Sequence, residues 1–255
     1  QESPGNILDP RFRGDDRQDY INFIIHQLLP EIAKEKLAKF CDGFVEKIAF
    51  TKAEAEEILK AAAKYGLQAK LHADQLSSNG GAVLAAKLKA VSADHLEHIS
   101  KKDMRALAKS GTIAVLIPSS TFFIGGPARQ SSGACPPVVW RGGRYAPARE
   151  IIGAGIDVAI STDYNPGTSP ILNLWLAATM AVTQMKLTVE EAYKGITINA
   201  AKALSLQKSH GSIEVGKAAD FVVLDAKNEV EPFYRFDRPF VAKVIKNGKI
   251  VYEKE

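Results

Sequence analysis

The chain has 255 residues, which is enough for one large domain, or for one domain with a small satellite, around a sizeable core. Its net charge of +4 comes without a basic run interleaved with aromatic residues, so no nucleic-acid partner is expected. The two cysteines do not form a disulfide framework, and the sequence has neither a signal peptide nor an apolar stretch of membrane-spanning length. These features predict a soluble, cytoplasmic protein with no membrane partner.

The expected elements begin after a leader. Residues 1–15 show no periodicity and are expected to be flexible. From Tyr20 the apolar residues recur with helical spacing, and this helix is expected to cross or break at Pro30. Thr51 and Glu54 form the pattern of a capping box, which predicts a helix that ends near Gly66. Further helices are expected at 81–88, 101–109, 146–154, 172–184 and 188–196, and strands at 40–48, 67–72, 90–95, 112–118 and 157–161.

Strands that alternate with helices in this way predict an α/β architecture, in which helical crossovers join parallel strands. A closed barrel needs eight strands and the pattern supplies five, so an incomplete (β/α) TIM-like barrel is expected. The missing Gly-rich phosphate loop gives nucleotide binding little support. The expected domains are the leader 1–15, a partial barrel 16–205 with an insertion at 125–143, and a small β-domain 206–255. In that last domain, 211–220, 221–224 and 241–252 are expected to form short antiparallel strands, with a tight turn at Asn247-Gly248.

Polar side chains close three of the predicted strands. His72, His95 and Asp163 each follow an apolar run, and the carboxyl ends of barrel strands converge on substrate, so the three are expected to meet at one rim. Imidazole and carboxylate groups bind metal and move protons, which favours a metal-dependent hydrolase. A structural interpretation stays open for each of them, as a histidine bonded at a strand end or as a turn carboxylate.

Other carboxylates near these groups are assigned more simply. Glu46 is expected to be a structural carboxylate at the mouth of the barrel rather than a catalyst. Asp74 and Asp94 flank the two histidines and either orient them or belong to turns, and the sequence leaves both interpretations open.

Several segments together carry a family resemblance. They are Phe40-Cys41-Asp42 with Glu46, Lys70-Leu71-His72-Ala73-Asp74, Ser92-Ala93-Asp94-His95-Leu96, Tyr145-Ala146-Pro147-Ala148-Arg149, Ser161-Thr162-Asp163-Tyr164-Asn165-Pro166-Gly167, Thr197-Ile198-Asn199-Ala200-Ala201 and the tail from Gly211 to Lys217 with Ala219-Asp220. In these segments the chain resembles the metal-dependent amidohydrolase superfamily and, within it, the imidazolonepropionase family. The resemblance covers roughly 16–125 and 144–255.

The resemblance implies a hydrolase of a cyclic C–N bond, which opens 4-imidazolone-5-propanoate to N-formimidoyl-L-glutamate in histidine degradation. It implies that His72 and Asp163 bind one divalent metal, zinc or iron, and that Asp163 also takes the proton of the attacking water. His95 would stabilise the developing negative charge on this small-molecule substrate. The substrate-binding residues that it implies are Gln75, Asn165, Gly167 and Thr168, and it implies a homodimer.

The chain departs from the family pattern in three places. The family's first barrel strand ends in His-x-His, whereas the five histidines here are His26, His72, His95, His98 and His210. Gln75 stands where the family has Glu, and an amide cannot take up a proton. The third departure is the segment 125–143, an insertion where the family connects a strand to its helix more tightly. Two alternatives to an active enzyme therefore stay open: an inactive remnant that serves as a binding or assembly module, and an enzyme half to which a second chain supplies His-x-His.

Overall fold

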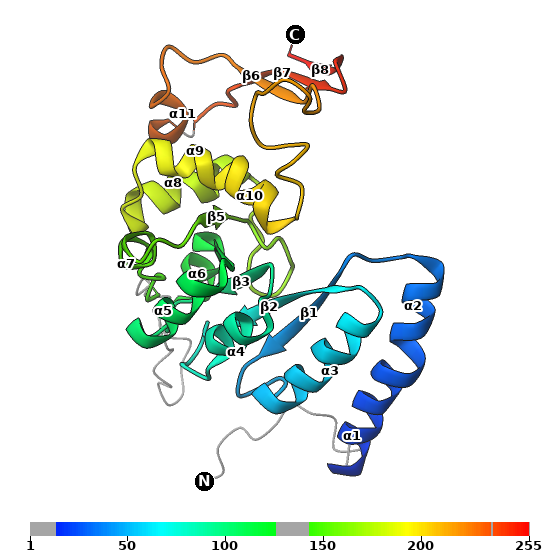
Figure 1. The fold of residues 1–255 in the computed structure, drawn as a ribbon. Coiled ribbons are helices and arrows are strands. Elements are labelled where there is room, and N and C mark those ends of the chain that lie inside the picture. The colour runs from blue at the N-terminus through cyan, green and yellow to red at the C-terminus, as the bar shows by residue number, and fades with distance from the viewer. Residues whose placement is uncertain (1–13, 126–142, 236, 255) are drawn as a thin grey trace. The chain divides into compact units, whose positions relative to one another are not determined.

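The computed structural model describes residues 14–125, 143–235 and 237–254 (Figure 1). The described residues fall into two compact units: those up to Asp94 with His98–Thr112, and His95–Glu97 with those from Ile113 on. Most of the expected leader and most of the expected insertion lie outside the described residues. None of the helices in the described ranges has the length and apolar character that a membrane crossing requires.

The first unit alternates strands and helices after an N-terminal helical segment. Strand β1 pairs in parallel with β2, from Phe40 opposite Gln68 to Val45 opposite Ala73, and β3 follows β2 in the strand order. Its elements are α1 (Gly14–Phe23), the π-helix η1 (Ile24–Leu28), α2 (Leu29–Glu35), β1 (Phe40–Val45), α3 (Lys52–Lys64), β2 (Gln68–Ala73), α4 (Gly81–Leu88), β3 (Ser92–His95) and α5 (Lys101–Ser110).

The N-terminal helical segment starts earlier than expected, at Gly14, and it continues through Pro30. A proline inside a helix lacks the N–H donor and its ring clashes with the carbonyl four residues back. The wider π-turn of Ile24–Leu28 lies directly before it, and such turns are a usual accompaniment of a disrupted hydrogen-bond ladder. Leu29 is buried with Ala61, Ala62 and Leu67, so this apolar face holds the segment against α3.

Two helices begin with the capping boxes that their sequences encode. Thr51 Oγ1 accepts the N–H of Glu54 at 3.3 Å, and Glu54 Oε2 accepts the N–H of Thr51 at 2.7 Å. Thr188 and Glu191 repeat the arrangement at the start of a helix in the second unit. Each box satisfies backbone donors that the first helical turn would leave without partners, so the boundary predicted at Thr51 is confirmed.

The second unit continues the alternation and ends in a separate small sheet. Strand β4 pairs in parallel with β5, and every residue of both strands is buried. Its elements are β4 (Ile113–Leu116), α6 (Pro118–Ile124), α7 (Ala148–Gly153), β5 (Val158–Ile160), α8 (Leu174–Met185), α9 (Val189–Ile196), α10 (Ile198–Ala203), β6 (Phe221–Leu224), α11 (Glu231–Tyr234), β7 (Val241–Lys246) and β8 (Lys249–Glu253).

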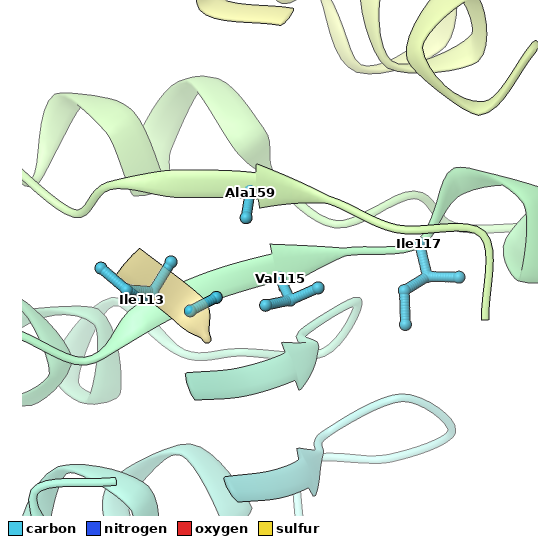
Figure 2. Packing of buried hydrophobic residues seen from close by; sticks show 5 residues of the cluster. Ile113, Val115, Ile117 and Ala159 are labelled. Atoms are coloured by element: carbon cyan, nitrogen blue, oxygen red, sulfur yellow. The ribbon is translucent and has the colours of Figure 1, made fainter. Parts of the chain in front are cut away.

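A buried apolar cluster lies on one side of these two parallel strands. Figure 2 shows the side chains of Ile113 and Val115 on β4 and of Ile117 just after it, beside Ala159 of β5. Ala203 of α10 completes the cluster. Ala114 and Leu116 on the opposite side of β4 are also buried, which explains why the sequence of this strand is continuously apolar rather than alternating.

The expected strand at 112–118 is shorter in the structure, because β4 ends at Leu116. Pro118 opens the helix α6, which the sequence pattern did not predict. Proline is favoured in the first helical turn, where the N–H that it lacks would have no intrahelical acceptor. Residues of this helix contact groups that follow β3 and β5.

The tail forms the predicted antiparallel sheet in the order β6-β7-β8, with the turn at Asn247-Gly248. Both turn residues have positive φ, 51° and 75°, as a two-residue hairpin turn requires. The prediction of a strand at 211–220 is wrong, because that segment is irregular. Gly211 has φ 92°, and a Cβ there would stand 2.7 Å from Ala201 Cβ, so the chain turns closely against α10 instead of extending.

Candidate active site

His95 is the last residue of β3, and the backbone around it is unusual. His95 has φ 80° and Leu96 has φ 71°, a region that residues other than glycine rarely adopt. Both side chains are buried, with 4% of His95 exposed. Residues held in such conformations concentrate at sites where geometry is fixed for function, which makes the end of β3 a candidate.

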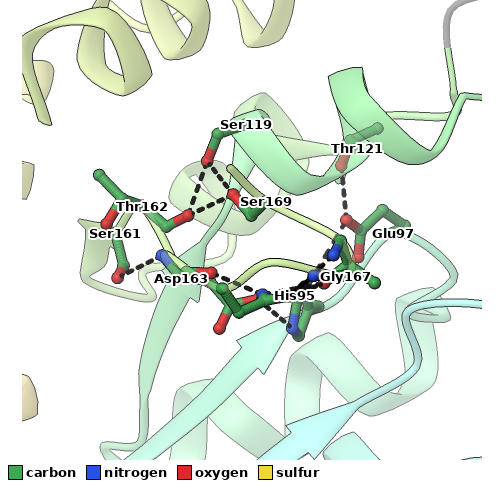
Figure 3. Close-up of polar contacts among 11 residues, drawn as sticks. His95, Glu97, Ser119, Thr121, Ser161, Thr162, Asp163, Gly167 and Ser169 are labelled. Atoms are coloured by element: carbon green, nitrogen blue, oxygen red, sulfur yellow. Dashed lines mark hydrogen bonds and ion pairs between the residues drawn. The ribbon is translucent and has the colours of Figure 1, made fainter. Parts of the chain in front are cut away.

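Asp163 approaches the ring of His95 from the segment after β5. Its Oδ2 atom lies 3.9 Å from His95 Nε2, and its side chain is 39% exposed, so the carboxylate contacts both the imidazole and solvent. Asp163 also has a positive φ, 48°. Figure 3 shows the two side chains facing each other. A solvent-facing carboxylate beside a buried imidazole can exchange protons with a bound molecule.

A second carboxylate lies at the other nitrogen of the same ring. Glu97 Oε1 is 4.0 Å from His95 Nδ1, and the Glu97 side chain is 5% exposed. The hydroxyl of Thr121, on α6, donates to Glu97 Oε1 at 2.6 Å (Figure 3). The imidazole of His95 therefore has one carboxylate near each ring nitrogen, and both separations are ion-pair distances rather than hydrogen bonds.

Buried hydroxyls hold the segment that carries Asp163. Ser119 Oγ donates to the carbonyl of Thr162 at 3.0 Å, and Ser169 Oγ donates to the same carbonyl at 2.5 Å (Figure 3). Ser119 and Ser169 are fully buried. The carbonyl directly before Asp163 is thus fixed by two donors, which limits how far its carboxylate can move.

Asn165, Gly167 and Thr168 contact one another in the loop that follows. Asn165 Oδ1 accepts from the N–H groups of Gly167 at 2.9 Å and Thr168 at 2.8 Å. Asn165 Nδ2 donates to the carbonyl of Asp163 at 2.8 Å and to Thr168 Oγ1 at 2.9 Å. The amide of Asn165 thus shapes its own loop beside Asp163, and the predicted contact of these three residues with substrate stays a prediction.

His72 and Gln75 belong to the first unit. His72 is near the end of β2, and its ring centroid lies 3.8 Å from that of Phe44. Burial lowers the pKa of His72 to about 4, because the charged imidazolium loses hydration. The imidazole is therefore neutral at neutral pH, which is the form that binds metal. Gln75 is buried, with 9% exposed.

Two buried carboxylates of the first unit have structural partners. Glu46 accepts from the N–H of Leu76 at 2.8 Å, from Ser77 Oγ at 3.0 Å and from Asn79 Nδ2 at 2.8 Å, which agrees with the structural role predicted for it. Asp74 accepts from four backbone N–H groups at the start of α4, at 2.9–3.3 Å, those of Asn79, Gly80, Gly81 and Ala82. Of the two interpretations left open for Asp74, these contacts favour a turn and helix cap.

The side chains present do not make up a complete metal site. Within residues 14–125, 143–235 and 237–254, no group of three or more His, Cys, Asp or Glu side chains could hold a metal ion. A structural zinc takes four protein ligands and a catalytic zinc takes three. His72 and Asp163 are suitable donors by chemistry, but the described side chains do not fit a metal.

The structure thus brings together two of the three strand-end groups, His95 and Asp163. His72 lies in the other unit, so the prediction that all three meet stays a prediction. Glu97 and Thr121 were missed as site residues. Glu97 had no strand signal, because β3 ends at His95 and the positive φ of His95 and Leu96 breaks the alternation of side chains. Thr121 had none, because its contact depends on a helix that the pattern did not predict.

Sequence comparisons extend along most of the chain. A model described as the amidohydrolase family matches residues 24–251. Imidazolonepropionase of Treponema denticola is 45% identical over 96% of this chain and 55% of its own length. Imidazolonepropionase of Cupriavidus pinatubonensis is 41% identical over 96% of this chain and 54% of its own length. The chain thus spans about half the length of the curated relatives it matches.

Solved structures share the fold at lower sequence identity. A zinc-bound adenosine deaminase from Xanthomonas campestris matches with a TM-score of 0.69 at 19% identity, over 92% of this chain and 56% of that chain. A Xaa-Pro dipeptidase with methionine in its active site matches with a TM-score of 0.71 at 22% identity, over 92% of this chain and 59% of that chain. Together with the five-stranded sheet and the small three-stranded sheet, these matches confirm the α/β fold class and the incomplete barrel.

Proposed function

Because the chain belongs to the amidohydrolase family, we propose that it carries part of the active site of an imidazolonepropionase-type hydrolase. The observation that carries the proposal is the approach of His95 Nε2 to Asp163 Oδ2, at 3.9 Å, in a chain 45% identical to an imidazolonepropionase. The substrate is a small molecule, 4-imidazolone-5-propanoate, and the product is N-formimidoyl-L-glutamate.

Asp163 and His95 have separate roles in the proposed hydrolysis. Water adds to the ring carbonyl carbon, the ring C–N bond breaks, and one proton of the water ends on the leaving nitrogen. Asp163, partly open to solvent, accepts that proton and passes it on. His95, buried beside it, stabilises the negative charge that develops on the carbonyl oxygen.

The remaining predicted residues are assigned to binding. Gln75 contacts the substrate ring, and Asn165, Gly167 and Thr168 hold the propionate arm. His72 and Asp163 would be two of the ligands of a divalent metal, zinc or iron. The neutral imidazole that burial gives His72 supports its part. A homodimer is proposed as the assembly.

An activity assay tests the proposal. The 255-residue chain is assayed for loss of imidazolonepropionate absorbance, alone and mixed with the part of the Treponema denticola relative that it does not cover. Bound metal is measured in both samples. His95→Gln and Asp163→Asn are expected to lower turnover by about 100-fold or more. The matched controls, His210→Gln and Asp237→Asn, change the same residue types in the tail and are expected to leave turnover unchanged.

Each outcome selects among the proposals. Turnover with stoichiometric metal in the chain alone supports a complete catalyst. Turnover that appears only on mixing supports an enzyme half that needs the segment carrying His-x-His. If neither sample turns over substrate, or if His95→Gln keeps full activity, the hydrolase proposal is wrong and a binding or assembly module becomes the better interpretation.

A further inference from the structure

Glu97 is a buried carboxylate to which the proposed reaction assigns no role. Only 4% of the residue is exposed, and it lies two positions after His95 in the sequence. An ionised carboxylate is removed from water at considerable free-energy expense unless charged or donor groups surround it. Its position therefore calls for a reason in the molecule.

Two groups of the second unit contact this carboxylate. Thr121 donates its hydroxyl to Glu97 Oε1 at 2.6 Å, the short distance expected for a charge-assisted O–H···O⁻ bond. The same Oε1 atom lies 4.0 Å from His95 Nδ1. Helix α6 thus holds the carboxylate, and the carboxylate faces the ring nitrogen that points away from Asp163 (Figure 3).

A carboxylate lies beside each nitrogen of the ring, and the one at Nδ1 is the buried one. A buried carboxylate held at Nδ1 favours the ring orientation in which a nitrogen, and not a ring carbon, faces it, as outer carboxylates do behind functional histidines. With Nδ1 facing Glu97, the ring presents Nε2 to the side where Asp163 meets solvent.

We propose that Glu97, held by Thr121, is a positioning residue that fixes the orientation of the His95 imidazole. It acts through His95 and does not touch substrate. The consequence for catalysis rests on the proposed hydrolase function, whereas the effect on the ring does not.

The test uses the 255-residue chain labelled with ¹⁵N in its five histidines. Correlations between ring carbon protons and ring nitrogens are recorded at one neutral pH for the wild type, Glu97→Gln and Thr121→Val. The His95 signals are identified by their loss in His95→Gln. Thr183→Val is the control, because Thr183 also donates its hydroxyl, to the carbonyl of Thr179 at 2.9 Å, but far along α8.

One sharp set of signals, from a single ring orientation, is expected for His95 in the wild type. Glu97→Gln should shift or broaden these signals as the ring gains a second orientation, and Thr121→Val should do the same to a smaller degree. The signals of His210, in the same unit, should stay in place, and Thr183→Val should change none of them. If circular dichroism shows that Glu97→Gln does not fold, the His95 signals of Thr121→Val decide whether the proposal stands.

Unchanged His95 signals in both variants would overturn the proposal. Kinetics in the sample that turns over substrate provide the second readout: Glu97→Gln should lower kcat by about 10- to 100-fold with little change in KM, and Thr183→Val should change neither. If the ring signals move but no sample is active, the hydrolase proposal fails and the positioning role stands. If the wild type is active and Glu97→Gln alters neither the ring nor kcat, the positioning role fails.

Discussion

The side chain of Asp74 shows how one buried carboxylate can organise a turn. It is fully buried at φ 52° and accepts backbone N–H groups of four residues, 79–82, where α4 begins. The N-cap of that helix, Gly80, has no side chain to offer, so Asp74 replaces a capping residue from outside the helix. A negative charge at this end also suits the helix dipole.

Replacing Asp74 by Asn is expected to lower the free energy of unfolding by about 1–3 kcal/mol. Asparagine tolerates the left-handed backbone conformation, so the substitution tests the side chain alone. The amide keeps one acceptor oxygen but presents an NH₂ group to N–H donors, which leaves at least one of them without a partner. Urea unfolding followed by circular dichroism measures the change. Asp19→Asn, an exposed position of α1, is the control, and an equal effect of both variants would contradict the cap role.

The sequence could predict the identity of the site residues better than their partners. His95 and Asp163 were predictable because each ends a buried apolar run, and strand ends are where a parallel sheet places functional groups. The partners of Asp74 could not be predicted, because they are backbone groups of a turn whose path depends on packing. Gly81 is an example: a Cβ there would stand 2.8 Å from Ala73 Cβ, a contact that no local pattern reveals.

At the scale of elements, arginine residues distant in sequence bind both capping-box glutamates. Arg17 of α1 donates to Glu54 Oε1 at 2.6 Å and to Oε2 at 2.7 Å. Arg149 of α7 donates to Glu191 in the second unit. A glutamate already fixed by its capping box loses little further freedom when it binds an arginine, so the pair joins two elements efficiently. This gives Arg149, noted in the sequence as part of Tyr145–Arg149, a structural role.

The Arg17–Glu54 pair predicts a pH dependence of stability. The guanidinium holds the pKa of Glu54 at about 2, below its ordinary value of 4.5, so the folded state favours the ionised carboxylate. The stabilisation is therefore present above pH 4.5 and is lost as the pH falls towards 2. Glu54→Gln retains the capping pattern but loses the ion pair, and it should lower the free energy of unfolding by ~1 kcal/mol at pH 7.

The difference between wild type and Glu54→Gln should shrink as unfolding is repeated at pH 4 and pH 3. Glu57→Gln, at an exposed position of the same helix, serves as the control for loss of one carboxylate. A wild-type advantage that persists unchanged at pH 3 would show that the ion pair is not its source.

The element boundaries that the sequence predicted best are those with a chemical marker. Thr51 with Glu54, and Asn247 with Gly248, mark their boundaries by side-chain capping and by positive φ. The N-terminal helical segment was predicted less well, because the residues before Tyr20 have no apolar face and Pro30 reads locally as a break. Burial of Leu29 against α3 overrides that local preference, since tertiary packing contributes more to helix stability than propensity does.

At the scale of the molecule, burial differs strongly between β4 and β5, two strands of the five-stranded sheet, and the three-stranded sheet of the tail. All residues of β4 and β5 are buried, whereas every residue of β8 is exposed and none of β6 or β7 is buried. An aromatic cluster of the second unit lies outside the small sheet, between α8, α9 and α11, where the rings of Trp175, Tyr193 and Phe233 meet at centroid distances of 4.9–6.0 Å. The antiparallel sheet depends mainly on its own hydrogen bonds and cross-strand pairs.

Amide hydrogen exchange should therefore separate the two sheets. Opening free energy rises with the apolar surface buried around a segment, so the amides of β6–β8 should exchange faster than those of β4 and β5, by a factor of about 30 or more if the opening free energies differ by about 2 kcal/mol. Exchange followed by mass spectrometry on the intact chain measures both sheets in one sample, so pH and temperature are matched internally. Pairing within β7, which bonds to strands on both sides, should make it the slowest of the three. Equal protection of β8 and β4 would mean that the tail sheet is buried in solution by something other than the described residues, such as a second copy of the chain. If dilution then makes β8 exchange faster, the second copy is what buries it.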